Sequence, residues 1–172
     1  MSSLVINNKK WKKIERRKIQ KNQKRKNKIM MQLVPYLNFM GNTEEAMNFY
    51  KSVFGGEFMT FQRFSDVPGT ADNLPDNEKN KMMHVALKIN DSITLMATDM
   101  LASVGHQLNI GNQISLSLNA ESKEEADKIF NGLSVDGKVE MPIEDTFWGA
   151  YFGMWEDKFG IKWMINYDYP KP

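Results

Sequence analysis

The chain has 172 residues, of which 41% are hydrophobic and none is cysteine. This composition suits one compact domain and excludes a disulfide-stapled secreted module or a thiolate metal site. The net charge of +2 hides an asymmetry, because residues 1–30 hold twelve of the 23 basic residues but one of the 21 acidic ones. No apolar run approaches the roughly 20 residues that cross a bilayer, and the first 30 residues lack a secretory signal's apolar stretch, so we expect a soluble cytoplasmic protein without membrane contact.

The composition of residues 1–30 predicts a basic, disordered extension that takes no part in the core. The segment has too few apolar side chains to offset the conformational entropy lost on ordering its backbone. Consecutive Met30 and Met31 stand where the globular pattern begins. They favour a solvated tail, or a start codon assigned too early, over a nucleic-acid-binding arm. Such an arm would bind phosphates through Lys and Arg, but we do not expect a nucleic-acid partner.

The globular pattern begins with a short apolar strand over 33–39, followed by a helix that runs to Phe54. Asn42 and Glu45 resemble a capping box, and two glycines end the helical spacing of apolar residues. The next three predicted strands cover 57–64, 83–89 and 93–98. The long segment 65–80 predicts a loop, either a lid over a cleft or a disordered surface excursion.

The same order then recurs, with an alternating strand near 114–118 and a helix from Ser122 to Leu133 that opens on a capping box with Glu125. The last three predicted strands cover 138–143, 150–155 and 161–167. The tripeptide Glu-Glu-Ala occurs at matching places in both halves, which indicates an internal duplication. We therefore predict an α+β fold of two βαβββ modules, about 31–104 and 109–172, whose paired curved mixed sheets surround a cleft.

Several short sequence motifs accompany this order of elements. They are Val34-Pro35-Tyr36-Leu37-Asn38-Phe39, Glu45-Ala46, Phe49-Tyr50, Phe54-Gly55-Gly56, Met83-His84, Asp99, Phe147-Trp148-Gly149, Asp157-Lys158-Phe159-Gly160 and Trp163. In order and spacing the chain resembles the vicinal oxygen chelate superfamily, and more narrowly its PhnB-like branch. The resemblance covers residues 31–169 and implies the glyoxalase/bleomycin-resistance/dioxygenase fold.

The resemblance also implies a place for a divalent metal, held by His, Glu or Gln on the first and last strands of the modules. The matching positions lie at or beside Pro35 and Tyr36, Met96 to Thr98, Gln113, and Met164 and Ile165. Only Gln113 among them is an ordinary ligand, so we expect no metal and no other cofactor. Members of the branch are often labelled as demethylubiquinone methyltransferase-like, yet paired βαβββ modules offer no glycine-rich turn for a nucleotide-like methyl donor.

His84 is the candidate catalytic residue. It lies on the opposite side of its strand from Met83, Val85, Leu87 and Ile89, and should therefore face the cleft if those four residues pack on a helix. There it would act as a general acid or base, or hydrogen-bond a substrate oxygen. The alternative is a structural histidine. His106 falls in the connection between the modules, where contact with water is expected. We expect Asp99 to be a strand-end residue whose side chain hydrogen-bonds local backbone amides.

The candidate substrate-binding residues come from the second module. They are Gln113, Trp148, Tyr151, Trp155 and Asn166. The aromatic members would wall a pocket and the amides would orient a ligand, although aromatic residues at strand spacing are also typical of a core.

The sequence is compatible with two functions. One is an enzyme that acts on a small oxygenated metabolite, and the other is a metal-free protein of bleomycin-resistance type that binds or sequesters a small molecule. In both cases we expect a homodimer, because open sheets need their edges and faces covered.

Overall fold

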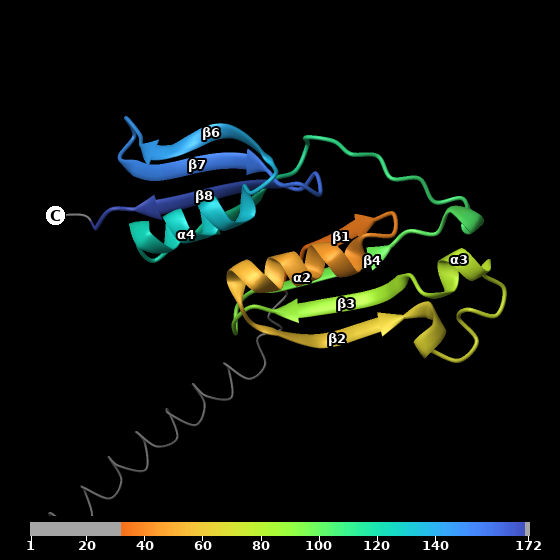
Figure 1. Cartoon of the computed structure of the whole chain (residues 1–172). Helices are drawn as coiled ribbons and strands as arrows, with labels where there is room; N and C mark the ends of the chain where they lie inside the picture. The colour runs from red at the N-terminus through yellow and green to blue at the C-terminus, as the bar shows by residue number, and fades with distance from the viewer. Residues whose placement is uncertain (1–31, 171–172) are drawn as a thin grey trace, which may run out of the picture. The chain divides into compact units, whose positions relative to one another are not determined.

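The computed structural model describes residues 32–170 and contains, within them, two four-stranded sheets that each carry a helix on one face (Figure 1). The first module consists of β1 (Tyr36–Phe39), α2 (Thr43–Phe54), β2 (Glu57–Arg63), β3 (Met82–Lys88) and β4 (Thr94–Asp99). The second consists of β5 (Leu116–Asn119), α4 (Lys123–Leu133), β6 (Lys138–Asp145), β7 (Ala150–Glu156) and β8 (Lys162–Asp168). The basic extension predicted over 1–30 lies outside the described residues.

Both sheets have the same topology, which confirms the predicted α+β fold of two βαβββ modules. Strand orders are β1-β4-β3-β2 and β5-β8-β7-β6. In each sheet the first strand pairs in parallel with the last, and the remaining pairs are antiparallel. Over residues 32–170, no helix is long and apolar enough to cross a membrane.

The first helix does not begin as predicted. Asn42 makes no side-chain cap bond, so the capping box expected there is wrong. Asp99, at the end of β4, takes its place: Oδ1 accepts from the amides of Gly41 (2.8 Å) and Thr43 (3.1 Å) and from the Thr43 hydroxyl (2.6 Å). Its Oδ2 accepts from the amide of Met82 (2.8 Å). Asp99 thus bonds amides from distant parts of the chain rather than local ones, and its charge suits the positive end of α2.

The second helix confirms its predicted cap. The Ser122 hydroxyl accepts a hydrogen bond from the amide of Glu125 at 3.2 Å, and the Glu125 carboxylate accepts one from the amide of Glu121 at 2.7 Å. These bonds satisfy two donors at the start of α4 that the helix itself leaves unpaired.

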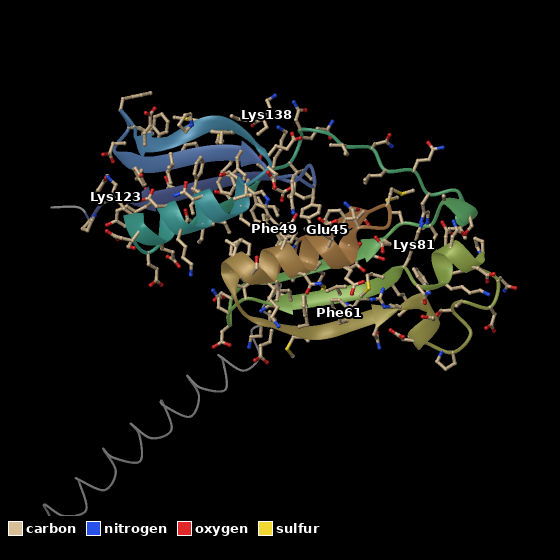
Figure 2. The ribbon with its side chains drawn as sticks, viewed as in Figure 1. Glu45, Phe49, Phe61, Lys81, Lys123 and Lys138 are labelled. Carbon is tan, nitrogen blue, oxygen red and sulfur yellow. The ribbon has the colours of Figure 1, made fainter. Side chains whose placement is uncertain are left out.

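The segment 65–80 is a structured connection, so the prediction of a disordered excursion is wrong. It contains the short helices η1 (Phe64–Asp66) and α3 (Asp76–Lys79). Buried Glu78 fixes it: the carboxylate accepts from Lys81 Nζ (2.9 Å), from the amide of Ala102 (2.9 Å) and from the Ser103 hydroxyl. Lys81 lies beside α3 in Figure 2.

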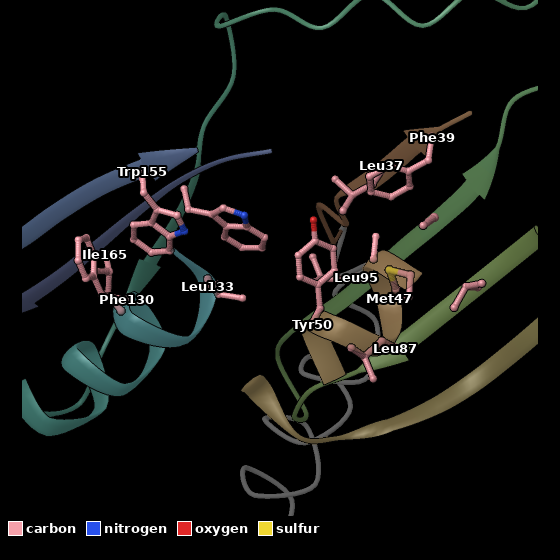
Figure 3. Packing of buried hydrophobic residues seen from close by; sticks show 14 of the residues in the cluster. Leu37, Phe39, Met47, Tyr50, Leu87, Leu95, Phe130, Leu133, Trp155 and Ile165 are labelled. Atoms are coloured by element: carbon pink, nitrogen blue, oxygen red, sulfur yellow. The ribbon is translucent and has the colours of Figure 1, made fainter. Parts of the chain in front are cut away.

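One apolar core serves both modules. On the first sheet, the side of Leu37, Val85 and Ala97 packs against α2, and on the second sheet the side of Trp155 and Ile165 packs against α4. The two helices also contact each other. Figure 3 shows the buried residues of both modules converging from the two sides.

The close approach of α2 and α4 depends on a glycine within α4. A Cβ built on Gly132 would lie 2.8 Å from the Cγ1 atom of Val53 in α2, closer than real Cβ atoms come to a neighbour. Glycine inside a helix costs about 1 kcal/mol relative to alanine, so its presence here has a packing reason.

A buried polar contact joins the modules within this core. Asp157 Oδ2 accepts from the Tyr50 hydroxyl of α2 at 2.7 Å and from the Trp163 indole N–H of β8 at 2.8 Å. Its Oδ1 accepts from the amides of Phe159 and Ile161 at 2.9 and 3.0 Å. Burial raises the pKa of Tyr50 far above its usual value, and the neighbouring Asp157 charge adds to this shift. Tyr50 therefore stays a neutral donor.

Replacing Tyr50 with Phe tests this contact. The change keeps the ring but deletes a buried hydrogen bond to a charged group, so we expect the free energy of unfolding to fall by about 2 kcal/mol. At about 2–4 °C per kcal/mol for a chain of this size, the melting temperature should drop by roughly 4–8 °C. Tyr169→Phe is the control, because it removes a surface bond to Asp145. Equal melting temperatures for Tyr50→Phe and the native protein would contradict the contact's role.

We predict that Glu78 makes the free energy of unfolding depend on pH in the acidic range. Hydrogen bonds from Ser103 and Lys81 lower its pKa from 4.5 to about 2. The unfolded chain therefore takes up the proton first as pH falls, and the stabilisation, complete above pH 4.5, is lost between pH 4.5 and 2. Urea unfolding of the native protein and Glu78→Gln should differ most at neutral pH and converge as pH falls through this range. A difference that stays constant down to pH 3 would contradict this assignment.

Candidate functional site

The first sheet has one face that neither α2 nor any other described element covers. The first open face, as this side is called here, includes by register the side chains of Tyr36, Asn38, Glu57, Thr60, Gln62, His84, Ala86, Lys88, Thr94, Met96 and Thr98. The side chains opposite and beside His84, Gln62 and Thr98, carry no charge. The face is therefore polar, and its carboxylate, Glu57, lies opposite Lys88, four residues along β3 from His84.

His84 lies on this face, and Val85 and Leu87 are buried on the helix side. The predicted phase of His84 is thus confirmed. Its ring stacks on that of Tyr36, with centroids 5.7 Å apart and planes 19° from parallel, and its Nδ1 lies 3.0 Å from the Tyr36 hydroxyl. The two side chains come from β3 and β1, with β4 between them. They form a hydrogen-bonded pair of two titratable groups.

The second sheet has a corresponding uncovered side, the second open face, formed by Ser117, Asn119, Phe152, Met154, Met164 and Asn166. Asn166 donates to Asp168 at 3.0 Å. Trp148, in the turn after β6, packs edge-on against Phe152, with centroids 5.9 Å apart, and is 52% exposed. Phe147 beside it is 98% exposed. The aromatic turn extends the second open face.

Two of the predicted substrate-binding aromatics lie instead on the helix side. Trp155 is completely buried and stacks on Trp163, with planes 12° apart. Tyr151 donates to Asp127 at 2.7 Å, and that bond raises the pKa of the Tyr151 phenol. Both side chains occupy packing positions, which agrees with the alternative that aromatic residues at strand spacing belong to the core. The exposed Gln113 belongs to the connection before β5.

The predicted site residues therefore fall into separate groups within one chain. His84 lies on the first open face, whereas Asn166 and Trp148 lie on the second. The helix sides of the two sheets share the core, so within one chain the two open faces point away from each other (Figure 1). Glu45 and Phe49, on α2, lie between the sheets in Figure 2, where Lys158 of the second module contacts both.

A hollow of about 270 Å³ lies elsewhere, where the end of α2 meets α4. Its walls are Val53, Phe54, Ile89, Ile93, Leu118 and Ile129, and its rim includes Asn90, Asn119, Glu121, Glu125 and Lys128. None of the residues predicted from the sequence to bind substrate lines it.

The residues present do not fit the divalent metal of the superfamily. The described part of the chain contains no group of three His, Cys, Asp or Glu side chains that could hold an ion. His106 is exposed and far along the chain from His84, and its Nδ1 accepts the amide hydrogen of Leu101 at 3.1 Å. Met96, Met164 and Ile165 offer a hard divalent ion no useful donor.

Tyr36 is the functional candidate that the sequence analysis did not single out. Its alternation with Leu37 and Phe39 places it on the face opposite the core, and this period of two was available in the sequence. The sequence did not indicate the contact of Tyr36 with His84, because the two residues are 48 positions apart in the chain.

Two βαβββ modules with these mixed sheets define the glyoxalase/bleomycin-resistance fold of the vicinal oxygen chelate superfamily, and solved proteins of this type with low sequence identity share it. Within that class, a family model described as 3-demethylubiquinone-9 3-methyltransferase matches residues 31–166. The chain therefore belongs to this PhnB-like family.

Individual proteins similar to this chain support the family assignment. Protein PA1353 from Pseudomonas aeruginosa is 40% identical, with a TM-score of 0.71 over 81% of this chain and 98% of that one. A PhnB protein from Bacillus cereus is 28% identical, with a TM-score of 0.65 over 80% and 99%. Protein YjdN of Escherichia coli is 32% identical over 143 residues, which cover 79% of this chain and 95% of YjdN.

Proposed function

We propose that the first open face binds a small oxygenated molecule and that the protein is a cytoplasmic enzyme in which His84 carries the acid–base chemistry. The observation that carries this proposal is the His84–Tyr36 pair at 3.0 Å on the first open face, with uncharged side chains opposite and beside the imidazole. An imidazole titrates near neutral pH and is suited to accept or donate a proton in catalysis. Asn38, Thr98 and Gln62 surround it with groups that hydrogen-bond a hydroxyl or carbonyl oxygen.

We propose further that a second copy of the chain completes the site. Each open face carries half-buried or exposed methionine and aromatic side chains, which a two-fold dimer would cover. If the second open face of one copy lies over the first open face of the other, Asn166 and Trp148 come near His84 and a cleft forms between the sheets. Gln113 stays a candidate in this arrangement, whereas Tyr151 and Trp155 keep their packing positions.

Sedimentation tests the assembly. We expect a particle of about twice the 19.9 kDa of the chain. Met164→Glu places a charge in the middle of the second open face and should shift the mass toward the monomer. Lys128→Glu, at an exposed position of α4 on the other side of the sheet, is the matched control and should leave the dimer intact. A native protein that sediments as a monomer at micromolar concentration would contradict the dimer.

His84→Gln tests the chemistry. Glutamine keeps a hydrogen-bonding group but cannot titrate, so the variant should retain a ligand and lose turnover by about 100-fold or more. Ligands are found by ligand-detected NMR with a panel of small hydroxy and oxo acids, and turnover is followed on each binder. His106→Gln is the control. Undiminished turnover in His84→Gln would contradict the catalytic role.

A metal-free binding or sequestering protein is the second candidate function. The polar groups opposite and beside His84 are the Gln62 amide and the Thr98 hydroxyl, and groups of this kind bind a ligand without transferring protons at neutral pH. Retention of a ligand by the native protein without any product would favour this function. Methyl transfer does not form part of either proposal, because the chain has no glycine-rich turn for a nucleotide-like donor.

A further inference from the structure

We propose that Tyr36 is the residue that exchanges a proton with the substrate, and that His84 behind it receives the phenol proton. This inference rests on the proposed enzymatic function and changes its assignment of roles. His84 would not meet the substrate first. The phenol oxygen would be the contact atom, and the imidazole its proton acceptor.

Exposure supports this order of the two groups. Tyr36 is 47% exposed, whereas His84 is half-buried in the middle of the sheet. The Nδ1 atom of His84 lies 3.0 Å from the phenol oxygen, and the nearly parallel rings keep that nitrogen beside it. A molecule approaching the first open face therefore reaches the phenol oxygen more readily than this imidazole nitrogen.

Hydrogen-bond chemistry fixes the resting direction of the proton. A neutral imidazole has one nitrogen that accepts and one that donates. The basic nitrogen is a better acceptor than a phenol oxygen, so the Tyr36 hydroxyl donates to Nδ1 and the ring proton of His84 sits on Nε2. The lone pairs of the phenol oxygen then remain available to a proton on the substrate.

The proton transfer balances without a metal or another co-reactant. The substrate is a small molecule with an acidic hydroxyl or with a C–H bond next to a carbonyl. Its proton forms a new O–H bond to Tyr36 while the original phenol proton forms an N–H bond to Nδ1 of His84. The products are a substrate anion, a neutral tyrosine and an imidazolium ion, and the reverse transfers return both protons. The neighbouring Asn38, whose side-chain amide has two N–H donors, lies on the same face and can donate a hydrogen bond to the anion.

The tautomer of His84 tests the pair without any substrate. The chain has only two histidines, so the spectrum of His84→Gln assigns both imidazoles in two-bond ¹H–¹⁵N correlation spectra of the full chain. We expect His84 to carry its proton on Nε2 in the native protein and to become a mixture of tautomers in Tyr36→Phe. His106 is the internal control, since its Nδ1 accepts from Leu101 in both proteins. A native His84 protonated on Nδ1, or an unchanged tautomer in Tyr36→Phe, would overturn the proposal.

Hydrogen–deuterium exchange tests the relay. Hydroxyacetone and pyruvate, each in D₂O with the native protein, serve as probes for proton abstraction next to a carbonyl. We expect exchange above the protein-free rate, reduced about 100-fold both in Tyr36→Phe and in His84→Gln, since general acid–base groups contribute this much. Tyr169→Phe, which deletes another phenol that bonds a side chain, is the matched control and should exchange at the native rate.

The outcomes separate the two proposals. Exchange that survives in Tyr36→Phe but is lost in His84→Gln would overturn the relay and leave His84 as the direct base. Exchange that survives in both variants would overturn the catalytic role of His84 itself. No exchange of either probe by the native protein would overturn proton abstraction next to a carbonyl as the reaction, while the tautomer measurement would still decide whether the pair exists.

Discussion

The contact of Tyr50 with Asp157 is the constraint on which the arrangement of the two modules depends. A carboxylate without a cationic partner is costly to bury unless donors surround it, and Asp157 has four: a phenol, an indole and two amides. Because the phenol belongs to α2 and the other donors to the second module, the charge is fully satisfied only when the modules pack through their helices. Separating them would leave a buried acceptor short of a donor, which adds a directional requirement to the apolar packing around it.

This packing decides where function can reside. Helix-to-helix contact uses the apolar side of each sheet for the common core, and it leaves the opposite sides uncovered. A βαβββ module has one helix for two sheet faces, so one face of each sheet must find another partner or remain open. The His84–Tyr36 pair is on one open face, and two of the five aromatic and amide candidates, Trp148 and Asn166, are on the other. The proposed second copy follows from this division, since it reunites groups that a single chain holds apart.

The buried acids of the described residues, Glu78, Asp99 and Asp157, all serve structural contacts. Asp99 joins the end of β4 to the start of α2 and to β3, and Glu78 fixes the connection before β3 against residues 102–104. Each accepts several hydrogen bonds, so each is committed to holding backbone segments together. On the first open face, by contrast, a phenol and an imidazole are in contact, while Glu57 lies opposite Lys88 further along β3. The proposed proton transfer uses the phenol and the imidazole.

The sequence by itself determined the elements and their faces. Apolar periodicity located both helices and the strands of both modules, and the period of two placed His84 opposite Val85 because neighbouring strand residues must point to opposite sides. Tertiary structure alone decided three things. It replaced the Asn42 cap with Asp99, it put Trp155 in the core, and it brought Tyr36 against His84. Each depends on contacts between residues distant in the chain, and local patterns carry no information about which distant groups will meet.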